Sequence, residues 1–209
     1  MKILIGDDHS VVRRGLKMII IEAYPEALVG EAADGTVLLN MLHKEKWDII
    51  ISDISMPGRN GLEIIKIIKE QTPTIPVLML SMHAAEHYAV RALKSGASGY
   101  LTKESASDEL IKAIKIIIAG KRYITQEIID LLVEQNNDTH TTELLHKQLS
   151  NREFEVMKML AEGKKVSDIA VVLSLSINTI STYRTRILEK MHFASNADLT
   201  KYALVKGFL

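Results

Sequence analysis

The sequence predicts a parallel α/β domain followed by a small all-helical domain, and three observations support this prediction. Short apolar runs rich in Ile and Val alternate with stretches of helical spacing over about the first 120 residues, which is typical of βαβ units in a parallel sheet. A polar segment near residue 140 interrupts the pattern, and only helical spacing follows it. The 209 residues are enough for two domains of moderate size.

Five apolar runs are the expected strands, because they are short and continuously apolar, as strands buried on both faces should be. Crossovers between parallel strands are right-handed, so helices should cover both faces of the sheet. We therefore predict a five-stranded, doubly wound sheet over residues 1–120. The expected strands are 2–6, 28–32, 48–52, 76–81 and 99–102, and the expected helices are 11–22, 36–44, 62–69, 86–95 and 107–119.

Polar side chains stand at the carboxyl ends of four of these runs: Asp7 and Asp8, Asp53, Ser81, and Lys103. Because the ends of parallel strands gather at one edge of a sheet, we expect these residues to lie together. Taken singly, each aspartate is a helix cap or a turn former, and the lysine is a surface residue. Together, three carboxylates, a hydroxyl and an ammonium favour a site for a divalent cation and a phosphoryl group.

The second domain is expected after a linker in the polar segment 135–142, which lacks apolar anchors. Ser150 and Glu153 form the pattern of a capping box at a helix start. Helices at 151–162, 167–173, 177–191 and 196–206 match a helix-turn-helix, with a plain helical bundle as the alternative from periodicity alone. The expected core residues are Phe154, Met157, Leu160, Ile169, Leu173, Ile180, Ile187, Met191, Leu199 and Ala203.

The chain therefore divides into a first domain (1–120), a connection with a short helix at 126–134 (121–147), and a helical domain (148–209). Its neutral total charge hides a split: residues 147–209 hold ten Lys/Arg and six Asp/Glu, net +4, and the remaining residues are net −4. A basic domain suggests nucleic acid, and a solvated basic surface is the alternative.

The absence of cysteine excludes disulfides and thiol ligands and fits a reducing cytoplasm. No uncharged apolar run reaches about 18 residues, and the N-terminus does not look like a signal peptide. We therefore expect a soluble, cytoplasmic protein with no membrane partner.

These residues resemble the two-component response regulators of the NarL/FixJ type, which join a receiver domain to a LuxR-type helix-turn-helix. The resemblance covers nearly the whole chain apart from the linker. In the first domain it rests on Asp7-Asp8-His9, the run 53–61, Ser81, and the run 99–103. In the second it rests on the runs 149–153, 160–163 and 187–191, and on Ile169-Ala170, Thr179-Ile180 and Tyr202-Ala203.

The resemblance implies a flavodoxin-like receiver in which Asp53 accepts a phosphoryl group, as a 4-aspartylphosphate, from a sensor histidine kinase. Asp8 and Asp53 would bind Mg²⁺ directly, Asp7 through water, and the main-chain carbonyl of Ser55 would be a further ligand. Lys103 would neutralise phosphoryl oxygens. The expected catalysis is limited to self-phosphorylation and slow self-dephosphorylation. A phosphatase is disfavoured, because Ser55 stands where such enzymes need a second aspartate.

Ser81 and Tyr100 are the expected switch. The Ser81 hydroxyl would donate to a phosphoryl oxygen, and Tyr100 would turn from solvent into the space vacated. The alternative is that Tyr100 packs permanently against the helix expected at 86–95.

The resemblance makes residues 177–191 the recognition helix in the DNA major groove, used by a dimer that forms on activation through the helix after Ser195. Relatives commonly carry Lys at the Ser181 position and His at the Tyr183 position, and Ser167 stands where Lys is frequent. The alternative is therefore a phosphorylation-controlled protein-interaction module that no longer binds DNA. Expected base contacts are Ser181, Thr182 and Thr185, and expected phosphate contacts are Thr179, Tyr183, Arg184 and Arg186.

Overall fold

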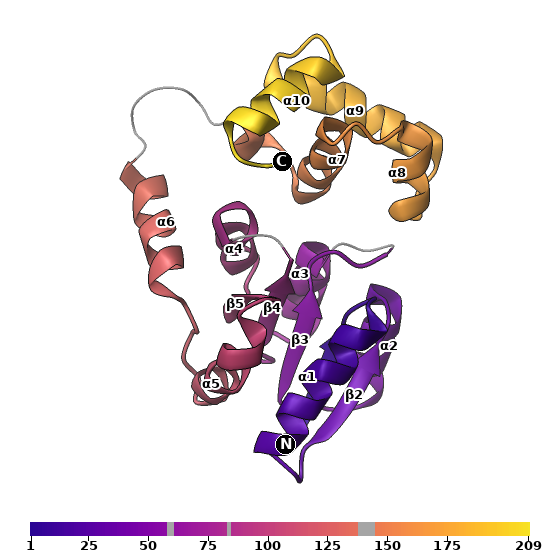
Figure 1. Cartoon of the computed structure of the whole chain (residues 1–209). Helices are drawn as coiled ribbons and strands as arrows, with labels where there is room; N and C mark the ends of the chain where they lie inside the picture. The colour runs from indigo at the N-terminus through magenta and orange to yellow at the C-terminus, as the bar shows by residue number, and fades with distance from the viewer. Residues whose placement is uncertain (58–60, 83–84, 138–144) are drawn as a thin grey trace. The chain divides into compact units, whose positions relative to one another are not determined.

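The computed structural model describes residues 1–57, 61–82, 85–137 and 145–209. The chain forms two compact units, Met1–Asp138 and Thr139–Leu209, and each is described by itself (Figure 1).

The first unit contains one five-stranded parallel sheet with the order β2-β1-β3-β4-β5. The predicted doubly wound α/β fold is therefore confirmed. The strand order reverses between β1 and β3, and in such folds ligands bind beyond the strand ends at this point. The strands are β1 (Lys2–Gly6), β2 (Leu28–Ala32), β3 (Ile49–Asp53), β4 (Val77–Ser81) and β5 (Gly99–Thr102).

Helices cover both faces of this sheet. The first helix and the fifth contact each other, as do the second and third and the third and fourth (Figure 1). Each helix lies within two residues of its predicted bounds. They are α1 (Ser10–Ala23), α2 (Gly35–Lys44), α3 (Gly61–Gln71), α4 (Ala85–Lys94) and α5 (Ala106–Ile118).

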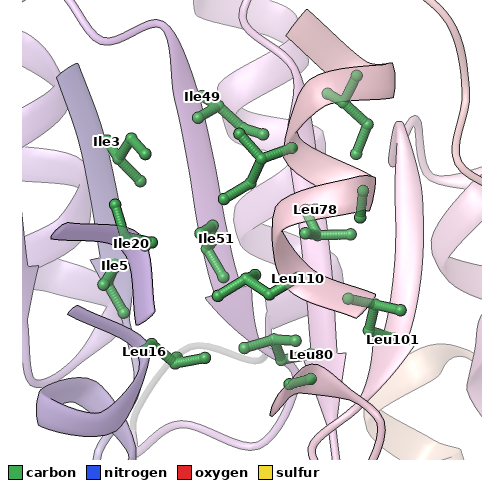
Figure 2. Packing of buried hydrophobic residues seen from close by; sticks show 14 of the residues in the cluster. Ile3, Ile5, Leu16, Ile20, Ile49, Ile51, Leu78, Leu80, Leu101 and Leu110 are labelled. Atoms are coloured by element: carbon green, nitrogen blue, oxygen red, sulfur yellow. The ribbon is translucent and has the colours of Figure 1, made fainter. Parts of the chain in front are cut away.

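The core on the α1 and α5 side is built from alternate strand residues, because successive strand side chains point to opposite faces. Figure 2 shows these side chains meeting residues of the two helices. Burial of this apolar surface fixes each strand, and with it the position of the polar residue that follows. The labelled members are Ile3, Ile5, Ile49, Ile51, Leu78, Leu80 and Leu101 of the strands and Leu16, Ile20 and Leu110 of the helices.

The chain after α5 also packs within the first unit. Gly120, at φ +79°, ends the helix region, and Tyr123 is buried and pairs with Gly99 in an isolated parallel bridge. Helix α6 (Gln126–Asn137) then lies against α4, with Ile128 buried. It runs three residues past the predicted end at 134. Residues 138–142 of the expected linker lie outside the described residues.

The second unit is all-helical. It adds one element that the sequence did not predict, the 3₁₀ helix η1 (Leu145–Gln148). The capping box of Ser150 and Glu153 is present, and all ten expected core residues are buried. The α helices are α7 (Asn151–Ala161), α8 (Val166–Val172), α9 (Ile177–Met191) and α10 (Asn196–Val205).

Helices α8 and α9 meet at 113°, within the range of a helix-turn-helix. Among the described residues no single helix is long and apolar enough to span a bilayer, and only this bent pair, taken together, has the length and composition to do so.

Candidate functional site

Two aspartates and a lysine meet at the carboxyl ends of three strands. Asp7 follows β1, Asp53 ends β3 and Lys103 follows β5. The Lys103 Nζ lies 2.7 Å from the Asp7 Oδ2 and 2.7 Å from the Asp53 Oδ2. Both carboxylates are buried, and the Lys103 side chain is only 6% exposed. The arrangement therefore holds two acidic groups on one buried cation.

The electrostatics of this cluster leave it short of positive charge. Burial raises the pKa of Asp53 to about 6, against the lowering effect of the hydrogen bond and charge of Lys103, and the charge of Asp7 raises it further. Burial alone would lower the pKa of Lys103, but its bonds to Asp53 and Asp7 raise it instead. One ammonium thus serves two carboxylates, with the third, Asp8, beside them. A second cation would relieve their repulsion.

The acidic side chains can share such a cation. Ligand atoms of Asp7, Asp8, His9 and Asp53 all lie within 4.8 Å of one another. The Asp8 Oδ1 is buried and accepts no hydrogen bond within the described ranges. The His9 Nδ1 lies 2.7 Å away, which is an ion pair only when the imidazole is protonated. Carboxylate oxygens with open acceptor capacity fit a hard divalent cation such as Mg²⁺.

His9 and Arg13 belong to the surroundings of the site, although the sequence assigned them no role there. The main-chain amide of His9 donates to the Asp7 Oδ1 at 2.8 Å. The Arg13 Nη1 donates to the Asp7 main-chain carbonyl at 2.6 Å. For His9 the signal was its place directly after the two aspartates. For Arg13 it was helical spacing, which puts the side chain one turn into α1, beside the end of β1.

Gly61 allows α3 to begin directly against the end of β3. Its amide donates to the Ile54 carbonyl at 2.9 Å. A Cβ at this position would collide with the main-chain oxygen of Asp53 and lie 2.8 Å from the Ile54 Cα. Ser55, the expected carbonyl ligand, follows Asp53 closely, and its amide donates to the Asp53 Oδ1 at 3.3 Å. Residues 58–60 of the predicted motif lie outside the described residues.

Ser81 on β4 and Tyr100 on β5 are diagonal neighbours, since Ser81 pairs with Thr102 and Tyr100 with Met79. Both are buried, Tyr100 with 1% exposure, and their side chains are hydrogen-bonded. Burial raises the pKa of Tyr100 to about 12. Of the two positions weighed from the sequence, the ring occupies the inward one, on a strand that α4 contacts.

The exposed face of α9 is the second candidate surface, and its two threonine hydroxyls are bonded within the helix. The Thr182 Oγ1 donates to the Asn178 carbonyl at 2.9 Å, and the Thr185 Oγ1 donates to the Ser181 carbonyl at 3.2 Å. Ser181 is exposed. Sequence reasoning did not single out Asn178, the exposed second residue of the helix.

The expected phosphate contacts on α9 divide into two groups. Arg186 is exposed, whereas Thr179, Tyr183 and Arg184 are half-buried. The Arg184 Nε donates to the Asn196 Oδ1 at 2.7 Å, so this guanidinium is held against the start of α10. The Thr179 Oγ1 lies 2.8 Å from the Ser176 Oγ, within the cap of α9.

Comparisons with known proteins match both units. Residues 3–115 match the response regulator receiver domain, and residues 147–203 match the luxR family of bacterial regulatory proteins. The chain is 32% identical over 207 residues to the response regulator UvrY of Escherichia coli K12, covering 99% of this chain and 95% of that protein. It is 36% identical over 216 residues to the oxygen regulatory protein NreC of Staphylococcus epidermidis, covering 100% and 99%.

A solved structure is also similar over almost the full length. RcsB from Salmonella enterica serovar Typhimurium, bound to promoter rprA in the presence of the phosphomimetic BeF₃⁻, is 29% identical. The match covers 97% of this chain and 98% of that one, with a TM-score of 0.66.

Proposed function

The chain belongs to the two-component response regulators that join a receiver domain to a luxR-type DNA-binding domain, and from this premise we propose that phosphorylation of Asp53 controls DNA binding through α9. The observation that carries the proposal is the Lys103 ammonium 2.7 Å from both Asp7 and Asp53. The relatives do not favour the alternative of a protein-interaction module without DNA binding.

The Asp53 carboxylate is the nucleophile. One of its oxygens forms a bond to the phosphorus of a phosphohistidine on a sensor histidine kinase, and the phosphorus–nitrogen bond breaks, the electron pair staying on the ring nitrogen of the released histidine. Lys103 stabilises the negative charge that the phosphoryl oxygens carry in the transition state. The chain needs no other catalytic activity than this self-phosphorylation and a slow hydrolysis of the product.

Mg²⁺ would fit the acidic cluster: Asp8, Asp53 and the Ser55 carbonyl would hold it directly, and Asp7 would do so through water. When bound, the ion supplies the positive charge that lets a phosphoryl group approach three carboxylates. The closeness of the Asp7, Asp8 and Asp53 ligand atoms, all within 4.8 Å of one another, supports this assignment.

Ser81 and Tyr100 form the switch. The Ser81 hydroxyl is bonded to Tyr100, so a phosphoryl oxygen on Asp53 would compete with the Tyr100 hydroxyl for it. Phosphorylation can shift the conformation only by its differential affinity for the two states. Because Tyr100 lines one cavity together with Gln126, Glu127 and Ile128 of α6, a change at Tyr100 alters the surroundings of the start of this helix.

The output is transcription regulation by a dimer on double-stranded DNA, and the similar protein RcsB has been solved as dimers bound to DNA. Two linked modules on two half-sites multiply a weak single affinity through effective concentration. Leu204 and Val205 on α10 are exposed and supply an apolar face for the dimer contact. We assign the receiver to 1–120, the connection to 121–147 and the DNA-binding domain to 148–209, and we place the protein in the cytoplasm, with its kinase's catalytic domain.

Acetyl phosphate tests the central step. The intact protein with Mg²⁺ and acetyl phosphate should gain the mass of one phosphoryl group, mapped to the peptide that contains Asp53. The variant Asp53→Asn should gain none, and Asp130→Asn, which changes an exposed aspartate on α6, should behave like the unaltered chain. An unmodified native chain, or an Asp53→Asn variant that still gains the mass, would refute the proposal.

A further inference from the structure

We propose that Asn178, at the start of α9, reads an adenine base through its side-chain amide and is the main source of sequence specificity in this protein. The inference rests on the proposed DNA-binding function and names the residue that selects the DNA sequence. Few side chains on the exposed face of α9 still have hydrogen-bonding groups to offer to DNA.

The position of Asn178 on the helix suits base recognition. Ile180, Ile187 and Met191 are buried and define the inner face of α9. With 3.6 residues per turn, Asn178, Thr182, Thr185 and Glu189 form the stripe on the opposite side. Asn178 is the second residue of the helix and is exposed. In helix-turn-helix proteins the N-terminal residues of the recognition helix contact the base edges.

The threonine hydroxyls on this face already donate hydrogen bonds within the helix. Each hydroxyl carries a single hydrogen, and those of Thr182 and Thr185 are directed to main-chain carbonyls four residues earlier. Only their acceptor lone pairs face outward. Such groups tell bases apart poorly, since they can accept from either amino-bearing base.

Two neighbouring side chains, Thr179 and Arg184, also form hydrogen bonds within the helical domain. The Thr179 hydroxyl is paired with Ser176 in the helix cap, and the Arg184 Nε is bonded to Asn196 on α10. Both residues are half-buried, unlike the residues of the exposed stripe. The remaining N–H groups of the Arg184 guanidinium suit a phosphate rather than a base edge.

Among the exposed residues Asn178, Ser181 and Arg186 remain, since Tyr183 is half-buried. Within the described ranges the Asn178 amide makes no hydrogen bond. It presents a donor and an acceptor side by side, which matches the N7 acceptor and N6 donor of adenine in the major groove. Ser181 has one hydroxyl and pairs with any base. Arg186 lies two turns further along and, as a long cation, suits a phosphate.

Two further features hold the contact at the N-terminal half of α9. The Ser176 hydroxyl accepts from the Thr179 amide at 3.1 Å, which caps the first turn and fixes the backbone that carries Asn178. Glu189 is exposed on the same stripe near the other end. A carboxylate facing the DNA backbone is repelled, so the footprint should end before it.

The test is selection from a pool of random double-stranded DNA by the full-length protein with Mg²⁺ and beryllium fluoride, followed by affinity measurements on the selected site and its single-base variants. The unaltered protein should prefer adenine at one position of each half-site by about 10- to 100-fold. Asn178→Ala should lose this preference and keep its affinity for the mismatched sites. Asn178→Asp should move the preference towards cytosine, since a carboxylate accepts from the cytosine amino group.

Asp130→Asn, which changes an exposed aspartate on α6 outside the helical unit, is the control; it should keep the adenine preference. All variants should unfold at the same temperature, since these side chains are exposed. If the native chain binds DNA and Asn178→Ala keeps the same base preference, the inference is wrong and the proposed function stands. If the native chain binds no DNA, the proposed function fails and the inference with it.

Discussion

The site at the strand ends and the recognition helix differ in what fixes their chemistry. At the first, Asp7, Asp53 and Lys103 are buried and held by the sheet, so the backbone topology alone brings them together. At the second, the residues lie on one exposed helix, so the helix itself makes them neighbours. What decides their use is the local hydrogen bonds that Thr182 and Thr185 make with the helix itself.

The two sites should also differ in how they respond to substitution. A buried charge cluster is sensitive to the loss of any member, because the remaining charges stay in a low-dielectric site without compensation. An exposed hydrophilic face is screened by water, and most of its members can be replaced with little effect. Substitutions should therefore have large effects at the strand ends and, apart from one or two positions, small effects on α9.

Replacing Lys103 should have the largest effect among variants that keep Asp53. Lys103→Met keeps the length of the side chain and removes the ammonium that lies 2.7 Å from both Asp7 and Asp53. Loss of such a transition-state contact should slow phosphorylation by acetyl phosphate by about 10²- to 10³-fold, measured as the rate of mass gain. Lys115→Met on α5 changes an exposed lysine and should leave the rate unchanged. A reduction below about tenfold would show that Lys103 is not needed for the transfer.

The sequence predicted the strand-end cluster well because its determinants are local. Each apolar run is long enough to be recognised as a strand, and the parallel sheet then brings the strand ends to one edge. The register of the last strand followed the same rule, since Ser81 pairs with Thr102 and the Lys103 amide donates to the Ser81 carbonyl at 2.8 Å. The core of the helical domain was equally readable, from the 3.6-residue period.

The features that the sequence missed depend on contacts between distant segments or on a choice between two local hydrogen bonds. The packing of α6 on α4 is of the first kind, as is the bond from Arg184 to Asn196. The hydroxyl of Thr182 is of the second kind, since a threonine in a helix can bond either outward or to the carbonyl four residues earlier. The orientation of Tyr100 could not be decided from the sequence either. A tyrosine can pack its ring inward or turn it towards solvent with its hydroxyl in water, and both are common.

The charge cluster should make the stability of the receiver depend on pH. The pKa of Asp53 is about 6 in the folded protein against an ordinary value of 3.8, so the folded state binds more protons between these values. This contribution to stability is complete below about pH 4 and is lost as the pH rises through about 6. Without metal ions, Asp53→Asn should therefore stabilise the receiver more at about pH 7.5 than at about pH 4.5, by about 2 kcal/mol.

Trp47 allows this measurement on the receiver alone. It is the single tryptophan of the chain, it is buried, and its Nε1 donates to the Met41 carbonyl at 3.2 Å. Urea unfolding followed by its fluorescence, in the presence of a chelator, gives the free energy of unfolding for the native chain and the variant at both pH values. Asp130→Asn should show no such pH-dependent difference. An equal effect of Asp53→Asn on the free energy of unfolding at both pH values would show that the site does not raise the pKa of Asp53.

The smallest effects should come from the threonines of α9. Thr185→Val preserves the shape of the side chain and removes a hydroxyl whose hydrogen is already directed to the Ser181 carbonyl, a carbonyl that the helix can satisfy without it. Its affinity for DNA, measured by fluorescence anisotropy, should change by less than about threefold. Arg186→Ala, one residue further, should instead weaken binding to all sequences alike and reduce the salt dependence by about one phosphate contact. A Thr185→Val variant that loses more than about tenfold would show that the hydroxyl leaves the helix backbone to meet the DNA, and the exposed face would then be as sensitive to substitution as the buried cluster.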